Sequence, residues 1–570
     1  MAVLIDSDKY KLKINNKDIQ VLINNEEVFE FDNRPFIFPN VKYGDEAFVF
    51  TVDILGGDLN FYIPLNGYGI INTQNAPYNW VIEWGDGIIE TKSGISSSLD
   101  TNYIQHNYLT SGTYKIIIKP VINDYQWMRA FGFLTGTTGN ANIVTNKNKM
   151  ISFDYITNKS FMQSSTSYGD YYLRQLATGT NIIYPANEVK TVSEDNIITI
   201  SNFFKCQQYF KCKNLILTEI EWLPDSIKII NNSFRYQQYA ECNNLQYIIN
   251  EYLSNNITNI GDNFRYQQYC GYFIPPTFTV TFDAPNEVMP NTVISIGNSF
   301  RYEQYRDSQC KNASLNEAFS INIKGTTGDN FRYQQYYNCT KLIGSTPNEV
   351  LPNVTFININ FRRNQYGMTN IVLCGNEFIP NTVTTIGDNF RYQQYFACRQ
   401  LNGPAIESLS NIVTKLGNYF RYRQYDMNYI NFKYTTPEIL PNSVTTIGTY
   451  FRGNQYSDCY GLTQTTPEIL PDSVINIGDS FRYRQYYGCT NLKIGNHIHC
   501  KKFNILLNIS NNNYVQMFSS NNNIIDTIPK YIDSNNIQQF ITNLTPSVRK
   551  QYCEGRIGIS GYASLHANWK

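Results

Sequence analysis

The stretch Phe331-Arg332-Tyr333-Gln334-Gln335-Tyr336 decides the fold, because closely related versions of it occur ten times in the chain. Eight of the nine intervals between copies are 29 to 31 residues long, and the ninth, before Phe300, is 36. A fixed period of this length is typical of a solenoid, in which each repeat forms one coil. The copies are anchored on Phe204, Phe234, Phe264, Phe300, Phe331, Phe361, Phe390, Phe420, Phe451 and Phe481.

Positions around each anchor are constant to different degrees. With the anchoring phenylalanine counted as position 0, position +4 is Gln and position +5 is Tyr in all ten copies. Position +1 is Arg in nine copies, +8 is Cys in six, −4 is Ile in eight and −3 is Gly in seven. Identical residues at one position of every coil stack into ladders along a solenoid, so we expect these side chains to meet between coils.

The constant positions also predict the local structure of a coil. Val444-Thr445-Thr446-Ile447 is largely β-branched and predicts a short strand. Gly448 follows at a tight change of direction, where we expect a positive φ. The phenylalanine then begins a compact turn or a single helical turn, which ends near the cysteine and a leucine such as Leu492. One unit cannot bury its own apolar face, so stacked units are expected to share a core of Phe, Ile, Cys and Leu.

The repeat resembles the BspA-like family of leucine-rich repeats, whose unit reads roughly Pro-x-x-Val-x-x-Ile-Gly-x-x-Phe-x-x-Cys-x-x-Leu. The copy from Pro471 through Phe481 to Cys489 and Leu492 carries this pattern. The spacer from Phe to Cys is longer here and is filled by Arg-Tyr-Gln-Gln-Tyr in several copies, which makes the repeat a variant subtype. The resemblance implies a leucine-rich-repeat solenoid of about ten repeats over residues 196–495.

Residues 41–120 predict a small β-sandwich. Strand-like segments lie at 48–52, 79–83 and 112–118, and Trp84-Gly85-Asp86-Gly87 is followed by His106-Asn107-Tyr108. These motifs resemble the PKD domain, an immunoglobulin-like sandwich that serves mostly as a spacer or adhesion module. Asp86 and His106 have the residue types of a metal or acid–base site, but we favour hydrogen bonds at a turn and a strand end. The predicted fold class is mainly β, a PKD/Ig-like sandwich followed by the solenoid.

The other segments are assigned by pattern. Residues 1–40 alternate as three short strands and predict an attachment arm. Residues 121–195 show no clean period and are expected to connect the sandwich to the solenoid and to cap it, with Phe161 as the start of a degenerate copy. Pro275-Pro276-Thr277-Phe278 predicts a surface loop. Residues 496–570 are interpreted as degenerate repeats and a C-terminal cap, and His497-Ile498-His499-Cys500 does not predict a metal site because its ligands would point to alternate faces.

Composition limits the class of function. Basic and acidic side chains both number 46, so no basic field predicts nucleic-acid binding. Six of the twelve cysteines lie at +8, where a thiol is a small buried hydrophobe rather than part of a disulfide framework. Neither a secretory signal nor a transmembrane helix is recognisable. Because there is no Gly-x-Ser-x-Gly, P-loop or His-Glu-x-x-His motif, we expect no enzyme and no cofactor.

The arginine at +1 and the residue at +2, usually tyrosine, are the candidate binding residues, and we expect both to be exposed. The invariant Gln and the +5 Tyr are better explained as structural ladders, because binding surfaces usually vary along a solenoid. For positions +1 and +2, a structural role and a binding role both stay open. The candidate residues are Arg235, Tyr236, Arg265, Tyr266, Arg301, Tyr302, Arg332, Tyr333, Arg391, Tyr392, Arg421, Tyr422, Arg482 and Tyr483.

These features predict a recognition protein. Aromatic and Arg side chains along a long face suit a cell-surface glycan or a protein receptor. The favoured setting is a receptor-binding tail fibre of a phage or phage-like particle, located in the virion, attached to a particle or baseplate protein through residues 1–40, with a homotrimer as one expected form. The alternatives are a BspA-type adhesin on the bacterial cell surface and an intracellular protein-binding scaffold. We expect no nucleic-acid partner and no membrane insertion.

Overall fold

The chain is mainly β, as the sequence predicts. The computed structural model describes residues 46–65, 76–96, 103–133 and 146–492, with short gaps inside the last two ranges, and the backbone of short strands nearer the two ends. Two compact units, Met1–Asp45 and Glu46–Lys570, make up the chain. Within the described residues, no helix combines the length and the apolar character needed to cross a membrane.

The first unit is a four-stranded antiparallel meander. Alternating side chains over residues 10–31 predict three of its strands, and the fourth precedes them, pairing Ala2 with Lys13 and Asp6 with Tyr10. The strand order β1-β2-β3-β4 follows the chain, which is the arrangement that short hairpin connections produce. The strands are β1 (Ala2–Asp6), β2 (Tyr10–Asn15), β3 (Asp18–Ile23) and β4 (Glu26–Asp32).

The second unit begins with sandwich-like antiparallel sheets. One sheet has the order β14-β11-β5-β10-β7-β8, and β6 pairs with β9 in the other. The larger sheet includes β11, from the segment expected to be a connector, and β11 pairs in parallel with the short strand β14. The strands are β5 (Phe48–Ile54), β6 (Asn60–Pro64), β7 (Ala76–Glu83), β8 (Ile89–Ser96), β9 (Tyr103–Asn107), β10 (Gly112–Pro120), β11 (Met150–Thr157) and β14 (Glu188–Val189), with the 3-10 helix η1 at Asn158–Phe161.

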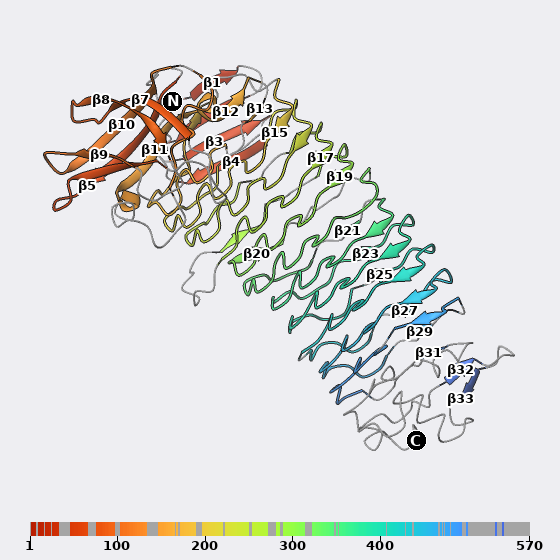
Figure 1. The fold of residues 1–570 in the computed structure, drawn as a ribbon. Helices are drawn as coiled ribbons and strands as arrows, with labels where there is room; N and C mark the ends of the chain where they lie inside the picture. The colour runs from red at the N-terminus through yellow and green to blue at the C-terminus, as the bar shows by residue number, and fades with distance from the viewer. Residues whose placement is uncertain are drawn as a thin grey trace. The chain divides into compact units, whose positions relative to one another are not determined.

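A parallel β-solenoid with turns of about 30 residues follows, as predicted. Nearly every coil contributes a two-residue strand at positions −5 and −4, and the strands of successive coils follow one another in order (Figure 1). In the coil anchored on Phe331, Thr326 makes only an isolated bridge to Phe356. The outer residue of each strand is exposed or half-buried, and the inner one, usually Ile, faces the core. These strands are β13 (Ser167–Tyr168), β15 (Thr199–Ile200), β16 (Ile229–Ile230), β17 (Asn259–Ile260), β19 (Ser295–Ile296), β22 (Phe356–Ile357), β24 (Thr385–Ile386), β26 (Lys415–Leu416), β28 (Thr446–Ile447) and β30 (Asn476–Ile477). The three-residue strand β12 (Met162–Ser164) precedes them and pairs antiparallel with β13.

Other short strands lie further from the anchors. Most of them start with glutamate and pair in parallel from one coil to the next, as Glu349 does with Glu377. They are β18 (Phe282–Asp283), β20 (Cys310–Asn312), β21 (Glu349–Val350), β23 (Glu377–Phe378), β25 (Glu407–Ser408), β27 (Glu438–Ile439), β29 (Glu468–Ile469) and β31 (Ile498–His499), and the antiparallel pair β32 (Lys530–Ile532) and β33 (Gln538–Phe540) comes after them.

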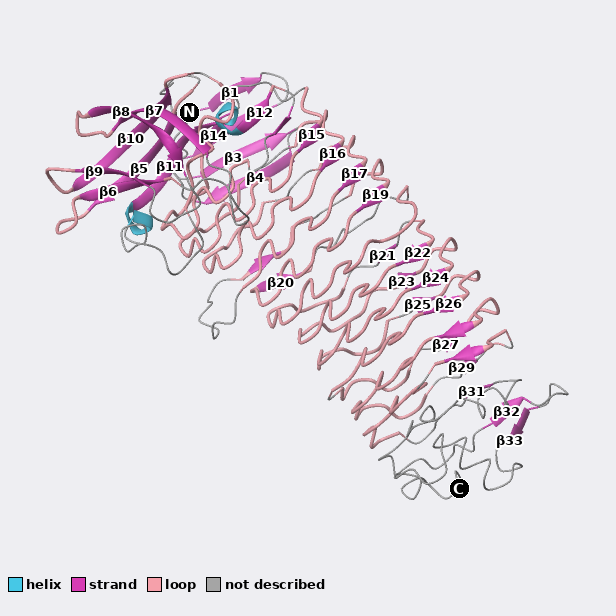
Figure 2. Cartoon of the chain, viewed as in Figure 1, coloured by secondary structure: helices cyan, strands magenta, loops and turns pink. Residues whose placement is uncertain are grey.

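The segment from the anchor to the cysteine is not a helical turn, and Figure 2 shows it as loop. Its backbone alternates: Ser233, Arg235 and Gln237 have φ between 51° and 60°, whereas the residues between them do not have positive φ. The N–H groups of the left-handed residues bond to neighbouring coils, as Gln237 N–H does to the Tyr266 carbonyl at 2.8 Å. The N–H groups of Tyr236 and Gln238 instead bond three residues back, to the carbonyls of Ser233 at 3.4 Å and Arg235 at 3.3 Å. Alternate residues therefore connect coils and close turns.

The glycine at −3 has a different role from the one expected. Gly417 and Gly448 are not at positive φ. A Cβ atom on Gly417 would lie 2.5 Å from the Gly387 carbonyl oxygen, and one on Gly448 would lie 2.5 Å from the Asn418 nitrogen. The expectation of a positive φ at Gly448 is wrong, because close approach of consecutive backbones, not turn geometry, requires glycine there.

The first coil is anchored on Tyr172 rather than on Phe161. The Tyr172 ring stacks on Phe204 with centroids 5.0 Å apart and planes 8° apart, so it continues the anchor ladder by one coil. Phe161 instead ends η1 and contacts Tyr172 edge-on. Residues 275–278, His497 and Cys500 lie outside the described residues, as do most of residues 496–570, and the predictions for them stay predictions.

The glycine ladder gives a test of this packing. Gly417→Ala is expected to lower the free energy of unfolding by about 1–3 kcal/mol, because the added methyl group would overlap the backbone of the preceding coil. Gly403→Ala is the control, since no atom lies within 4 Å of a Cβ at Gly403; it is expected to change stability by less than about 0.5 kcal/mol. Thermal and urea denaturation measure both, and equal effects of the two substitutions would contradict the close-approach explanation.

Candidate binding surface

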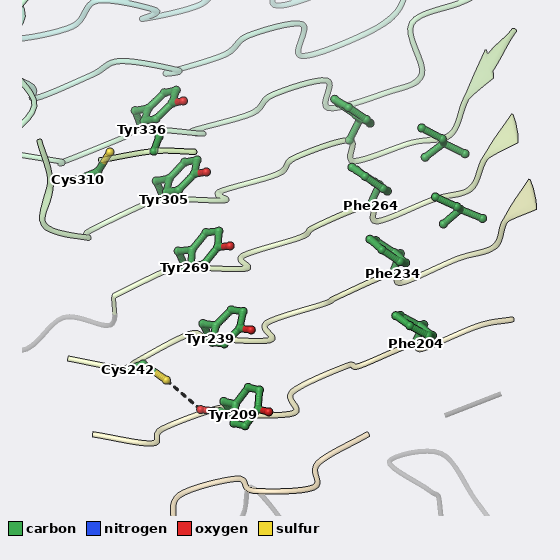
Figure 3. Packing of buried hydrophobic residues seen from close by; sticks show 14 of the residues in the cluster. Phe204, Tyr209, Phe234, Tyr239, Cys242, Phe264, Tyr269, Tyr305, Cys310 and Tyr336 are labelled. Carbon is green, nitrogen blue, oxygen red and sulfur yellow. Dashed lines mark hydrogen bonds between the residues drawn. The ribbon is translucent and has the colours of Figure 1, made fainter. Parts of the chain in front are cut away.

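The ten anchor phenylalanines form one continuous stack inside the solenoid. Consecutive rings lie 5.1–5.5 Å apart and nearly parallel, and Figure 3 shows Phe204, Phe234 and Phe264 aligned in this way. The arginine at +1 lies against the ring that precedes it, with 4.8–5.6 Å between its guanidinium carbon and the ring centroid. Cations at this distance from an aromatic face are attracted to it.

The arginines at +1 are buried, which corrects the expectation that they are exposed. None of the seven candidate arginines is more than 5 % exposed: they are Arg235, Arg265, Arg301, Arg332, Arg391, Arg421 and Arg482. Residue +1 is left-handed and lies between non-left-handed neighbours, so the in–out alternation of an extended strand does not apply to this segment. A buried guanidinium cannot contact an external ligand, so these residues have the position of structural groups.

The first Phe-anchored coil shows how a buried cation is balanced in this fold. Lys205 occupies +1 and is 1 % exposed. Its Nζ lies 3.1 Å from a carboxylate oxygen of Glu188 and 2.7 Å from one of Glu219, which are both largely buried. A buried charge is tolerated only with such partners, since an isolated one would cost several kcal/mol.

The invariant glutamine at +4 forms an amide ladder. Gln238 Nε2 donates to Gln208 Oε1 at 2.9 Å, and the same donation joins Gln335 to Gln304 at 3.2 Å and Gln455 to Gln424 at 3.0 Å. All ten glutamines are buried, with no more than 2 % exposed. A side-chain amide offers both a donor and an acceptor, so each glutamine can satisfy the coil before it and the coil after it.

The invariant tyrosine at +5 and the cysteine at +8 are also internal. The Tyr209 hydroxyl accepts the N–H of Ala186 at 2.9 Å, and Tyr425 accepts that of Ala405 at the same distance. The Cys242 thiol donates to the Tyr209 carbonyl oxygen at 2.9 Å, as drawn in Figure 3. The described cysteines are all free thiols. Burial raises the pKa of the Cys398 thiol to about 11, so it stays protonated and unreactive at neutral pH.

The tyrosines at +2 are the candidate residues that reach the surface. Tyr236, Tyr266, Tyr302 and Tyr333, here called the tyrosine stripe, are half-buried and stack 4.6–4.7 Å apart. Tyr392 and Tyr422 continue the ladder at 5.2 Å, and Tyr483 is likewise half-buried. Because neighbouring rings cover the faces, the stripe presents ring edges and hydroxyl groups rather than open aromatic faces.

A second ladder next to the tyrosine stripe was not predicted. At position +3, Gln207 Nε2 donates to Gln237 at 2.7 Å, Gln237 donates to Gln267 at 2.6 Å, and Gln267 donates to Glu303 at 2.6 Å. Position +3 is Gln in five copies and otherwise Glu, Asn or Arg. This partial constancy was the sequence feature that could have predicted the second ladder, since amides and acids at one position can hydrogen-bond in series along a solenoid.

The surface of the strands varies between coils, although position −6 is Thr in five copies, whose hydroxyl groups donate to backbone carbonyls of the preceding coil. Positions −6 and −5 are both exposed in several coils, and we call these pairs the outer strand face: Lys228–Ile229, Ile294–Ser295, Thr355–Phe356, Thr414–Lys415 and Ile475–Asn476. The flanking positions −7 and −4 of these coils carry Ile, Val or Leu and are buried or nearly so. Charge, size and polarity thus change from coil to coil outside an almost constant interior.

Asp86 and His106 are neighbours in the antiparallel sheets. His106 Nε2 lies 2.8 Å from Asp86 Oδ2, and the His106 ring stacks on Trp84 at 4.4 Å. Asp86 also accepts the N–H of Ile88, and the Tyr108 hydroxyl donates to the Trp84 carbonyl. These are the turn and strand-end hydrogen bonds that the sequence favoured. No cluster of three or more His, Cys, Asp or Glu residues suited to a metal ion occurs among the residues described.

No protein-family model, no curated protein and no solved structure matches the chain. The solenoid and the antiparallel sheets are therefore established by their geometry alone. The resemblances to BspA-like repeats and to the PKD domain stay predictions.

Arg332 is buried and its neighbour Tyr333 is half-buried, so the effects of substituting them on stability can be compared directly. Arg332→Ala is expected to cost about 2–5 kcal/mol of unfolding free energy, because it leaves a cavity in place of a fully buried side chain and removes the contact with the Phe331 ring. Tyr333→Ala is expected to cost about 1–2 kcal/mol, mainly through lost ring stacking. Urea denaturation of both proteins measures the difference, and a larger loss for Tyr333→Ala would contradict the assignment of Arg332 as an internal group.

The Asp86–His106 pair predicts a pH dependence. Burial raises the pKa of Asp86, but the hydrogen bonds from His106 and the Ile88 N–H outweigh it and hold the pKa below its ordinary value of 3.8. A lowered carboxyl pKa stabilises the fold above about pH 4, and this contribution is lost as the pH falls through the folded-state value. The stability difference between the wild type and Asp86→Asn should therefore shrink between pH 6 and pH 3; a difference independent of pH would count against this coupling.

Proposed function

We propose that this chain is a non-catalytic recognition protein that contacts a cell-surface glycan or protein through the outside of its solenoid. The observation that carries the proposal is the contrast between a constant interior and a varied outer strand face. A rigid scaffold that changes its exposed side chains every coil suits a surface that must fit one partner over several repeats. Loops and faces of such scaffolds are common places for binding residues.

The side chains of the outer strand face fit this role. Phe356 is 37 % exposed, Ile294 is 48 % exposed and Ile475 is 68 % exposed, so apolar area is available between polar neighbours. The tyrosine stripe adds hydroxyl groups, and burial raises the pKa of its member Tyr266. Burial also raises the pKa of Tyr422, which lies further along the ladder, to about 12. These hydroxyls therefore remain protonated donors at neutral pH.

The setting that we propose is a receptor-binding tail fibre of a phage or phage-like particle, with residues 1–40 as the attachment arm. The BspA-like and PKD resemblances support adhesion, because the motif Trp84-Gly85-Asp86-Gly87 forms a turn of the kind expected and the repeats form a solenoid. A cell-surface adhesin would use the same solenoid in the same way. Both settings require the chain to meet a cell surface, and the experiments below separate them from an intracellular scaffold.

Location is the first test. Particles purified from the producing strain are analysed by mass spectrometry and immunogold labelling with an antibody against the chain. Label at a tail or fibre tip is the expected result. Label confined to the cell envelope would contradict the tail-fibre setting and favour a cell-surface adhesin. Protein found only in the cytosol would contradict both settings.

Adsorption of the purified chain to cells tests the surface. Phe356→Ser combined with Lys415→Ser is expected to weaken adsorption about tenfold, because two exposed contacts of about 0.5–1 kcal/mol each are lost without disturbing the core. A second variant combines Tyr266→Phe, Tyr302→Phe and Tyr333→Phe. It keeps the ring stack and measures how much the hydroxyl groups of the tyrosine stripe contribute to adsorption. Unchanged thermal midpoints establish folding, and adsorption unaffected by both variants would overturn recognition through these surfaces.

A further inference from the structure

One coil departs from the repeat in a way that opens its surface. In the coil anchored on Phe420, position +8 is Asn instead of Cys. The buried Tyr429 takes over the thiol's role: its hydroxyl donates to the Tyr395 carbonyl oxygen and accepts the Cys398 N–H. Phe432 packs against Tyr425 at 5.3 Å and against Tyr429 at 4.8 Å. Two large rings thus fill the core that Cys and Leu fill elsewhere.

A glycine on each neighbouring coil borders this altered path. Gly461 lies so close to the carbonyl oxygen of Ile430 that a Cβ atom would overlap it. Gly403 has no atom within 4 Å of a Cβ position, so its missing side chain leaves open space. Departures from a regular pattern that need such compensation are expected at functional sites.

The result is a hollow of about 520 Å³ between the coils anchored on Phe390 and Phe420. Its lining includes Gly403, Ile430 and Tyr434, with the polar side chains of Asn402, Asn431 and Lys433. This volume lies within the range of about 300–1,000 Å³ typical of small-molecule sites. We call it the Tyr434 hollow.

The lining has a distinct chemistry. Tyr434 is 54 % exposed and Ile430 is 67 % exposed. Tyr434 pairs with Gln464 of the following coil, and the preceding coil presents Gly403, which has no side chain to cover the ring. Among the described residues no aromatic ring stacks on Tyr434, in contrast to the rings of the tyrosine stripe. Two side-chain amides offer donors and acceptors, and Lys433 is the one charged group of the lining. An open aromatic face with amides and an ammonium group matches a ring that has a C–H face, hydroxyl groups and a negative charge.

We propose that the Tyr434 hollow binds one unit of an acidic saccharide, with Tyr434 as its stacking surface, Asn402 and Asn431 as partners of its hydroxyls and Lys433 as partner of its carboxylate. This site rests on the recognition function proposed above and names the class of ligand. Lys433 sets the preference for an acidic over a neutral sugar, because no carboxylate lines the hollow to repel the anion. Tyr434 and the space over Gly403 are required for any sugar.

Saturation-transfer NMR on the full chain tests the site, with glucuronic acid as the probe and glucose as its neutral counterpart. The wild type is expected to bind glucuronic acid at least fivefold more tightly than glucose. Tyr434→Ala and Gly403→Leu are expected to weaken binding of glucuronic acid at least tenfold, whereas Lys433→Gln abolishes only the preference. Tyr247→Ala is the matched control, since Tyr247 is similarly exposed, at 56 %, in another coil.

Each outcome decides something. Absence of binding by the wild type, or equal binding by Tyr434→Ala, Gly403→Leu and Tyr247→Ala at unchanged thermal midpoints, overturns the Tyr434 hollow as a saccharide site. Adsorption of the same proteins to cells distinguishes failure of the saccharide site from failure of the proposed recognition of cells. If the wild type and both hollow variants adsorb equally, recognition stands and the hollow fails; if glucuronic acid binds but no cell type does, the hollow stands and the proposed recognition of cells fails.

Discussion

The structure depends on a strip of backbone hydrogen bonds between coils that runs through left-handed residues. Four positions in most coils, at −1, +1, +3 and +7, adopt positive φ with side chains other than glycine. Each such residue costs about 1–2 kcal/mol in isolation. The cost is offset because the same residues send their N–H groups to the adjacent coils, where bonds of 2.7–3.0 Å are made at nearly every step. One coil alone would carry the strain without these partners.

This strip explains why some positions never change while others vary freely. Coils in close backbone register bring like side chains within contact, so each internal position must tolerate a copy of itself. Phenylalanine stacks on phenylalanine, and glutamine bonds to glutamine. Arginine does not satisfy arginine, and at the first Phe-anchored coil the cation at +1 is held by two glutamates instead. On the outer strand face the rule is weaker: position −6 is Thr in five copies, whose hydroxyl groups bond to the preceding coil, and the other exposed residues differ from repeat to repeat.

Much of the fold was predictable because the period is explicit. Ten anchors at a nearly constant spacing predict stacked coils and internal ladders of Phe, Gln, Tyr and Cys, and alternation in residues 48–52 and 112–118 predicts the antiparallel strands. The burial of the arginines was not predictable, because the backbone around +1 alternates between left-handed and other residues, and the in–out alternation of a strand does not apply to it. Sequence patterns assume uniform right-handed or extended residues, and a chain alternating between hands places successive side chains differently.

The candidate site was predictable only in part. The tyrosine stripe was named from the sequence, and the structure shows it half-buried with covered faces. The Tyr434 hollow could not be found from the repeat, because Tyr434 sits outside the constant positions and the space beside it depends on Gly403 of the neighbouring coil. The hollow is formed by residues of two neighbouring coils, so it can be recognised only once the positions of both coils are known.

The buried thiols can report where the solenoid opens locally. Cys212, Cys242, Cys339, Cys398, Cys459 and Cys489 each lie inside a different coil, with a thiol that burial keeps protonated. A thiol reacts with an alkylating reagent only when its coil separates from the neighbours, so the order of modification along the chain reports the order of local opening. In a linear array, where each coil contacts only its neighbours, that order reveals whether the solenoid frays from an end or breaks in its middle.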